Sequence, residues 1–197
     1  MVTLDILTAL QPVVETLDKL SISYYIGGSV ASSIYGLPRA TMDIDIVADI
    51  QNHHISSLEQ ILRKDYYVDE NMIREAINHN ASFNLIHLKT AIKIDIFIRK
   101  GDQYQENAKR RKRKDTLIED EERTEFFFSS PEDIILNKLQ WYEMGGRVSE
   151  RQWLDVIGVI KVQKNLLDIS YLTDWSRKLE IHGLLIEAFH DSGVQLV

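Results

Sequence analysis

The chain has 197 residues, of which 44% are hydrophobic and 27% are charged, and its formal net charge is −7. This composition is typical of a globular protein that is long enough to bury a full core, as one domain or as two small ones. The lack of cysteine excludes disulfides, zinc–thiolate sites and a cysteine nucleophile, and the negative charge argues against indiscriminate nucleic-acid binding by the whole surface.

The first twenty residues indicate a cytoplasmic protein. They include Asp5, Glu15 and Asp18 and lack the basic start and apolar core of a signal peptide. No apolar run in the sequence approaches the roughly 18 residues of a membrane-spanning helix, so we expect no membrane partner. Leucine and valine at helical spacing over residues 3–20 predict a packing helix that Pro12 would kink.

A glycine turn follows the first predicted strand, residues 22–26. Gly27 and Gly28 can adopt positive φ and let a ligand approach the backbone closely. Ser29 is a natural N-cap for a short helix over residues 30–35. Since the N-terminus of a helix attracts anions, this turn is predicted to bind an anion, for which phosphate is the best-suited ligand.

The second predicted strand, Met42–Ala48, places two carboxylates side by side. Asp43 and Asp45 alternate with Met42, Ile44 and Ile46, and a period of two sorts the two sets onto opposite faces of a strand. The carboxylates would repel each other unless a cation lies between them. Hard oxygen ligands next to a phosphate-binding turn indicate Mg²⁺ rather than zinc or copper.

A third carboxylate occurs in a later strand with the same pattern. Residues 82–88 and 91–98 predict an antiparallel hairpin, and Asp95 lies opposite a line of isoleucines in its second strand. If this strand neighbours the strand of Asp43, then Asp95 converges with Asp43 and Asp45. A lone aspartate is costly to bury unpaired in an apolar strand, which favours a functional role for Asp95.

A basic run follows the hairpin and has two interpretations. It consists of Lys109, Arg110, Arg111, Lys112, Arg113 and Lys114, and the acidic run 119–122 comes shortly afterwards. The charges either compensate one another on a solvated helix and loop, or the basic residues bind the phosphates of a nucleotide or an RNA. No aromatic residues alternate with the basic ones, so sequence-specific base recognition is not indicated.

From Ser130 the sequence becomes helical. Ser130 and Pro131 are an N-cap and a first helical residue, a second helix is expected from Ser149, and a third is expected over residues 171–179. We therefore predict an α+β fold, in which a small mixed sheet flanked by helices is followed by a C-terminal helical bundle. The expected domains are 1–129 and 130–197, the second packed on the first.

Three of these motifs together carry a family resemblance. The three motifs are Gly27-Gly28-Ser29, Asp43-Ile44-Asp45 after thirteen intervening residues, and Asp95. In this order and spacing they resemble the signature of the polymerase-beta-like nucleotidyltransferase superfamily over residues 20–100. Within it the chain is similar to bacterial abortive-infection (AbiEii-type) toxin nucleotidyltransferases. The segments that match these toxins are Arg39–Asp45 (R-x-T-x-D-I-D), Lys138 and Arg151–Asp155 (R-x-x-x-D), whereas the G-S-x-A-R-G of the minimal members is absent at Ser32-Ser33.

The resemblance implies a catalytic nucleotidyltransferase domain over 1–129 that moves a nucleoside monophosphate from a nucleoside triphosphate, such as ATP, to a hydroxyl group. Asp43, Asp45 and Asp95 would bind two Mg²⁺ ions and be the catalytic residues. The phosphates would bind to Gly27, Gly28 and Ser29, with Arg39 and Lys138 neutralising further charge.

The acceptor is left open by the sequence. One hypothesis is RNA, for instance a tRNA end, bound through Lys109, Arg110, Arg111, Lys112 and Arg113 in a toxin–antitoxin or defence setting with an antitoxin as partner. Another is a small hydroxylated molecule, such as an aminoglycoside, or a protein. A third is an inactive nucleotide-binding module, against which the presence of all three carboxylates argues.

Overall fold

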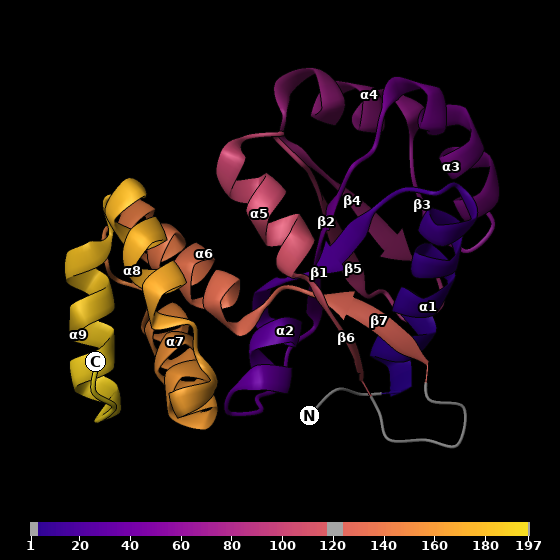
Figure 1. Ribbon diagram of the computed structural model, residues 1–197. Helices are drawn as coiled ribbons and strands as arrows, with labels where there is room; N and C mark the ends of the chain where they lie inside the picture. Colours follow the sequence, from indigo (N-terminus) through magenta and orange to yellow (C-terminus); the bar gives the residue numbers. More distant parts are fainter. Residues whose placement is uncertain (1–3, 118–123, 197) are drawn as a thin grey trace. The chain divides into compact units, whose positions relative to one another are not determined.

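The computed structural model describes residues 4–117 and 124–196 (Figure 1). Contacts divide the chain into two compact units. The first consists of Met1–Val30 and Ala40–Phe128, and the second consists of Ala31–Arg39 and Ser129–Val197. The short segment Ala31–Arg39 therefore belongs with the C-terminal helices, although it lies between the first two strands in sequence.

The first unit is built on a mixed sheet. Its described strands, in spatial order, are β3 (Tyr66–Tyr67), β4 (Ser82–His87), β5 (Lys93–Ile98), β2 (Asp43–Ala48), β1 (Tyr24–Ile26), β7 (Glu125–Phe128) and β6 (Arg113–Thr116). The central strand β2 pairs in parallel with β5 and antiparallel with β1. β4 and β5 form the predicted antiparallel hairpin. The two aspartate-bearing strands are thus neighbours, which was the condition for Asp95 to converge with Asp43 and Asp45.

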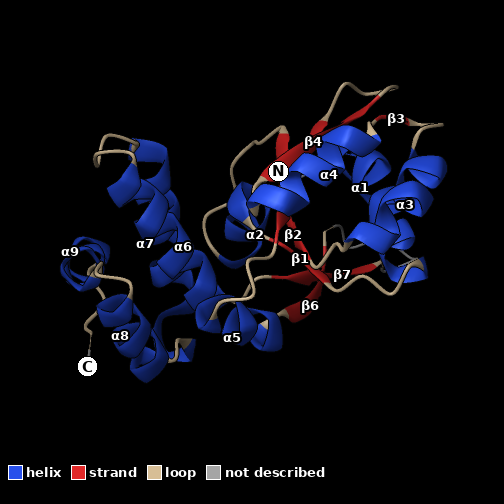
Figure 2. Ribbon diagram, turned by 90° about the horizontal axis from the view of Figure 1, so that it is seen from above, coloured by secondary structure: helices blue, strands red, loops and turns tan. Residues whose placement is uncertain are grey.

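Helices of the first unit pack against this sheet. They are α1 (Leu4–Lys19), α3 (Ile55–Leu62, after the 3-10 turn Asn52–His54), α4 (Glu70–His79) and α5 (Gln103–Arg111). Figure 2 shows α1, α3 and α4 gathered on one side of the sheet. α1 runs through Pro12 and buries residues at helical spacing, including Ile6, Leu10 and Val13.

The isoleucines fix the register of the two central strands. Ile44 and Ile46 of β2 and Ile94 and Ile96 of β5 are at most 1% exposed. Burying one such side chain contributes about 1.5–3 kcal/mol, and a slip of one residue would move the aspartates into the core. Hydrophobic burial therefore holds the charged side chains of both strands on the opposite face of the sheet.

The second unit is helical. It contains α6 (Pro131–Met144), α7 (Glu150–Gln163, followed by the 3-10 turn Lys164–Leu166), α8 (Ile169–Lys178) and α9 (His182–Ser192). Ser130 caps α6 as predicted and accepts a hydrogen bond from the N–H of Asp133. Ser149, where the second helix was expected to begin, caps α7 and accepts from the N–H of Gln152. Within the described residues, none of the helices has the length and apolar character needed to cross a membrane.

The sequence prediction differs from the structure at several boundaries. α2 spans Gly28–Tyr35 and so begins two residues before the predicted start; Ser29 lies inside its first turn and is not its N-cap, and Gly28 has a positive φ. The strands β3 and β6 and the helix α9 were not predicted. The acidic run 119–122 and the first residue of the predicted N-terminal helix lie outside the described residues.

Two glycines allow a close backbone contact within the second unit. A Cβ on Gly36 would lie 2.8 Å from both the carbonyl oxygen of Ser32 and the amide nitrogen of Val159, and one on Gly158 would lie 3.1 Å from the amide nitrogen of Leu37. Backbone atoms cannot yield as a flexible side chain can, so residues 36–37 pack directly on the backbone of α7.

Gly36→Ala should therefore destabilise the protein by about 1–3 kcal/mol, because the backbone must shift to admit the methyl group. Denaturant unfolding followed by tryptophan fluorescence measures this. Gly183→Ala is the matched control: nothing lies within 4 Å of its Cβ position in α9, so it should be neutral or stabilising. Equal stability of the two variants would contradict the packing argument.

Candidate active site

Three aspartates lie close together on the face of β2 and β5 opposite the buried isoleucines. Asp45 is directly opposite Asp95 in the parallel pairing, and Asp43 is opposite Lys93. The side chain of Asp43 is 67% exposed, whereas that of Asp95 is 16% exposed. The structure therefore brings together Asp43, Asp45 and Asp95, as the sequence predicted, on two neighbouring strands.

The glycine turn lies directly against Asp45. The N–H of Gly27 donates to the carbonyl oxygen of Asp45 over 2.9 Å, and Gly28 has a φ of +55°. A Cβ on Gly28 would lie 1.7 Å from Oδ2 of Asp45. Only glycine can occupy this position, and the start of α2 with Ser29 is thereby held next to the aspartates.

Lys93 is a member of this site that was not predicted from the sequence. Its Nζ lies 2.7 Å from Oδ2 of Asp95 and 4.0 Å from Oδ1 of Asp43. The hydrogen bond to Asp95, together with the charges of Asp95, Asp43 and Asp45, holds the pKa of Lys93 above its usual value. The sequence signal that could have identified Lys93 was the K-x-D spacing, which puts Lys93 and Asp95 on one face of a strand.

The chemistry of these side chains fits a hard cation. Carboxylate oxygens are the ligands that Mg²⁺ prefers, and the ammonium group of Lys93 already lies against the carboxylates of Asp95 and Asp43. With Lys93 in this position, the three aspartates are not placed to hold a metal ion together. The same is true of every other group of three or more His, Asp or Glu side chains over residues 4–117 and 124–196.

Arg39 and Lys138, the two predicted phosphate-binding cations, lie in the second unit and share one carboxylate. Nε and Nη2 of Arg39 donate to Asp155 over 2.8 and 3.0 Å. Nζ of Lys138 lies 2.8 Å from Oδ2 of Asp155 and donates to Gln152 over 2.9 Å. The Lys138 and Asp155 side chains are 6% and 5% exposed. Asp155 is the end of the R-x-x-x-D segment.

The pKa of Asp155 reflects these contacts. Burial alone would raise it, but the hydrogen bonds and charges of Arg39 and Lys138 outweigh burial and hold the pKa below its usual value. This cluster contains two positively charged side chains, Arg39 and Lys138, which both pair with the negatively charged Asp155. Lys138 and the R-x-x-x-D segment were recognised in the sequence, but the contact between Lys138 and Asp155 was not predicted.

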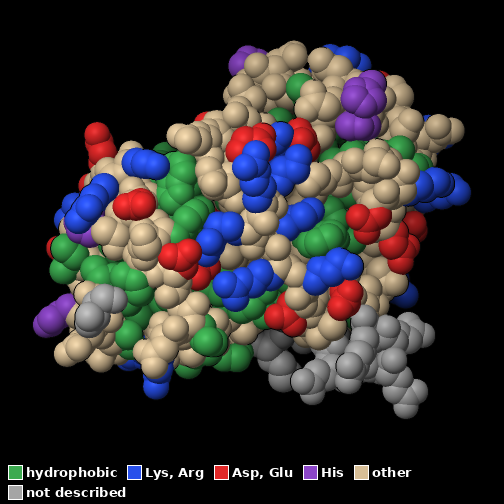
Figure 3. All heavy atoms as spheres, in the orientation of Figure 1, with side chains coloured by type: hydrophobic (Ala, Val, Ile, Leu, Met, Phe, Trp, Pro, Cys, Tyr) green, Lys and Arg blue, Asp and Glu red, His purple; other side chains and the backbone are tan. Residues whose placement is uncertain are grey.

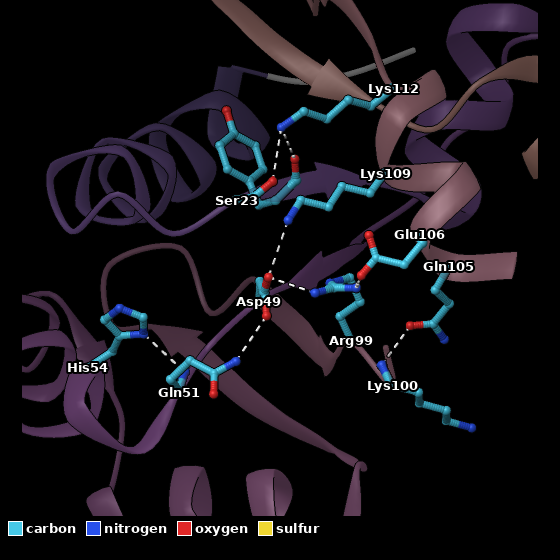
Figure 4. Close-up of polar contacts among 11 residues, drawn as sticks. Ser23, Asp49, Gln51, His54, Arg99, Lys100, Gln105, Glu106, Lys109 and Lys112 are labelled. Carbon is cyan, nitrogen blue, oxygen red and sulfur yellow. Dashed lines mark hydrogen bonds and ion pairs between the residues drawn. The ribbon is translucent and has the colours of Figure 1, made fainter. Parts of the chain in front are cut away.

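Part of the basic run is bound to the protein itself. Lys109 pairs with Asp49, which also accepts from Arg99 (Figure 4). Lys112 donates to the hydroxyl of Ser23 and the carbonyl of Tyr24. Burial would raise the pKa of Asp49, but its hydrogen bonds to Arg99 and Lys109 and the charge of Arg99 lower it overall. These contacts attach α5 to the ends of β1, β2 and β5.

The remaining basic residues are mixed with acidic ones at the surface. Lys114 pairs with Glu125 over 3.5 Å, and Arg110 and Arg113 are exposed. Figure 3 shows Lys and Arg side chains interspersed with Asp and Glu on the face that carries α5. The local compensation of charge that the sequence allowed is therefore seen for Lys109 and Lys114, with Asp49 and Glu125 as partners; the acidic run 119–122 lies outside the described residues.

Comparison with solved structures identifies the fold. The antibiotic-resistance factor ANT(2'')-Ia superposes with a TM-score of 0.56 and 12% identity over 94% of this chain and 96% of that one. An antigenic nucleotidyltransferase-like protein from Paracoccidioides brasiliensis superposes with a TM-score of 0.55 and 16% identity over 96% and 94%. No protein-family model matches the chain, and no curated protein sequence matches it significantly.

These similarities show that the chain has the nucleotidyltransferase fold, in agreement with the α+β prediction. The fold is a mixed sheet with flanking helices, followed by further helices.

Asp155→Asn should destabilise the protein by about 3–5 kcal/mol at neutral pH, since it leaves the buried Lys138 without its anionic partner. Arg39 and Lys138 hold the folded-state pKa of Asp155 below its ordinary value. Its stabilising effect is therefore fully present above about pH 4 and is lost as the pH falls through that lower value. Denaturant unfolding between pH 3 and 7 should show the gap between wild type and variant narrowing below about pH 4.

The matched control is Asp174→Asn, which removes an exposed carboxylate from α8 and should change stability by less than about 0.5 kcal/mol. A loss in Asp155→Asn that is no larger than in this control, or a gap that stays constant down to pH 3, would contradict the role assigned to Asp155.

Proposed function

We propose that this protein is a Mg²⁺-dependent nucleotidyltransferase that moves a nucleoside monophosphate from a nucleoside triphosphate to a hydroxyl acceptor. One observation carries the proposal: Asp45 and Asp95 face each other across the parallel β2–β5 pair beside Asp43, with the carboxylate of Asp45 against Gly28 at the start of a helix. Cation ligands and an anion-binding turn thus meet at one place, which is what a metal-bound triphosphate requires.

Each residue has a role in this proposal. Asp43 and Asp45 would hold two Mg²⁺ ions and Asp95 would complete the second site. Gly27, Gly28 and Ser29 would bind the triphosphate through backbone N–H groups and the serine hydroxyl. Arg39 and Lys138 are proposed to add positive charge for the phosphates, an effect that their shared pairing with Asp155 would reduce.

The reaction is a substitution at the α-phosphorus. A bond forms between the acceptor oxygen and this phosphorus, the bond to the bridging oxygen breaks, pyrophosphate leaves and the hydroxyl proton is released. Bound Mg²⁺ would lower the pKa of the hydroxyl and stabilise the charge that grows on the phosphates. The protein's own contribution is to hold the three carboxylates and the glycine turn in a fixed register.

We propose a small hydroxylated molecule as the first acceptor class. The chain resembles an antibiotic-resistance factor in fold along nearly its whole length, and its negative charge suits a cationic acceptor. RNA, including a tRNA end, is the second class, and Arg110 and Arg113 of the basic run are exposed at the surface where it would bind.

The family resemblance extends the proposal to a toxin–antitoxin setting in the cytoplasm. If the chain is such a toxin, induced expression of the wild type should slow bacterial growth, and Asp43→Asn should not. Equal growth of the two strains at equal protein levels would set this role aside without affecting the transferase proposal.

A transfer assay tests the proposed function: purified protein is incubated with each α-labelled nucleoside triphosphate, Mg²⁺ and either total RNA or a set of aminoglycosides. We expect label to be transferred to one acceptor class. Asp43→Asn and Asp45→Asn should each reduce the rate by about 10²–10³-fold or more, because they remove a metal ligand. Asp65→Asn, an exposed aspartate outside the site, is the charge-matched control. Label transfer that is equal in all four proteins would refute the proposed site.

Gly28→Ala should reduce transfer more strongly than Gly27→Ala. The methyl group at Gly28 must displace the carboxylate of Asp45, whereas nothing lies within 4 Å of a Cβ at Gly27. Initial rates compared with circular dichroism spectra separate an effect on the site from unfolding. A larger loss in Gly27→Ala would contradict the proposed contact between the turn and Asp45.

A further inference from the structure

The carboxylates of the site already have a cation, and it belongs to the chain. Lys93 lies opposite Asp43 in the β2–β5 register and two residues before Asp95 on the same face. Its ammonium group lies 2.7 Å from Oδ2 of Asp95 and 4.0 Å from Oδ1 of Asp43. A single side chain thus reaches two of the three proposed metal ligands.

We propose that Lys93 is an internal counter-ion that competes with divalent metal for the carboxylates, so that metal binds only when the lysine leaves Asp95. The inference rests on the proposed function, because it assumes that Asp43, Asp45 and Asp95 are metal ligands. It goes beyond that function by assigning to Lys93 the control of metal affinity.

The competition follows from charge and space. Aspartates facing each other across paired strands repel one another unless a cation lies between them. The ammonium group relieves this repulsion and lies against a carboxylate that a metal would also use. Since an ammonium group and a divalent cation at the same carboxylate repel each other, metal binds more tightly to the protein in which Lys93 has left Asp95, and the apparent metal affinity falls with the fraction of protein in that state.

The lysine is suited to leave. Its side chain is 43% exposed, so water can replace the carboxylate as a partner, and its four-carbon stem lets the ammonium group swing away while the backbone stays fixed between β2 and β4. Partly exposed ion pairs are weak, so the expected effect on metal binding is about three- to tenfold rather than complete inhibition.

The competing role for Lys93 is a direct contact with the nucleotide. In that case its loss would weaken binding of the triphosphate and would not tighten binding of metal alone. Metal binding in the absence of nucleotide therefore separates the two roles.

The test is a titration of each variant with Mn²⁺ alone, with free Mn²⁺ followed by electron paramagnetic resonance. Lys93→Gln should bind Mn²⁺ about three- to tenfold more tightly than the wild type, because the competitor is gone. Lys93→Arg, which keeps the charge, should stay within about twofold of the wild type or bind more weakly. Lys89→Gln removes an exposed lysine from the turn before β5 and should match the wild type.

The Mn²⁺ binding that belongs to the proposed site is the part of the total Mn²⁺ binding that Asp45→Asn abolishes. Unchanged or weaker Mn²⁺ binding in Lys93→Gln would overturn the inference, as would equal tightening in Lys89→Gln, which would reveal an effect of net charge only. Mn²⁺ binding that is insensitive to Asp45→Asn in every variant would also overturn it.

The two proposals fail in distinguishable ways. Tighter Mn²⁺ binding in Lys93→Gln without label transfer to any acceptor would support the counter-ion and refute the transferase. Label transfer that depends on Asp43 and Asp45, without tighter Mn²⁺ binding in Lys93→Gln, would support the transferase and refute the counter-ion.

Discussion

The central constraint of this structure is the repulsion among aspartates that hydrophobic burial forces onto one face of a sheet. Ile44, Ile46, Ile94 and Ile96 bury the other face of β2 and β5 and so fix the register that sets Asp45 opposite Asp95. Two unit charges 4 Å apart interact by about 1 kcal/mol in water and by about 4 kcal/mol at the effective dielectric of a protein surface. A cation is needed there, and the fold supplies one in Lys93.

The ionic clusters around Asp155 and around Lys93 differ in burial, and this difference suggests different uses. Asp155 and Lys138 are nearly inaccessible, so breaking their pair leaves a charge that water cannot solvate. Lys93 and Asp43 are in contact with solvent, and their partners can be exchanged at low cost. The first cluster holds residues of the helical unit together, whereas the second is the one for which we propose metal binding.

Patterns within one element were predicted well from the sequence. Alternation of isoleucine and aspartate located β2 and β5, and Ser130 and Ser149 marked the starts of α6 and α7, because these signals depend on neighbours a few residues apart. The grouping of Asp43, Asp45 and Asp95 followed once the two strands were taken as neighbours. Their parallel direction depends on the chain path between them, which no local pattern specifies.

Features that depend on distant contacts were missed. β6 was read as part of a charged segment, because its strand conformation comes from pairing with β7 and not from the propensity of its residues. The pairing of Arg39 with Asp155 joins residues 116 positions apart. Lys93 was missed because a lysine in a strand is usually a solvated residue, and only the register shows that it faces Asp43.

A crystal structure of the protein with Mn²⁺ and a non-hydrolysable nucleoside triphosphate analogue, with anomalous scattering used to locate the metal, would test the central claim most directly. We predict anomalous peaks at bonding distance from Asp43, Asp45 and Asp95, the triphosphate at Gly28 and Ser29, and the ammonium group of Lys93 displaced from Asp95. Manganese and nucleotide bound elsewhere, with Lys93 still in contact with Asp95, would contradict the account.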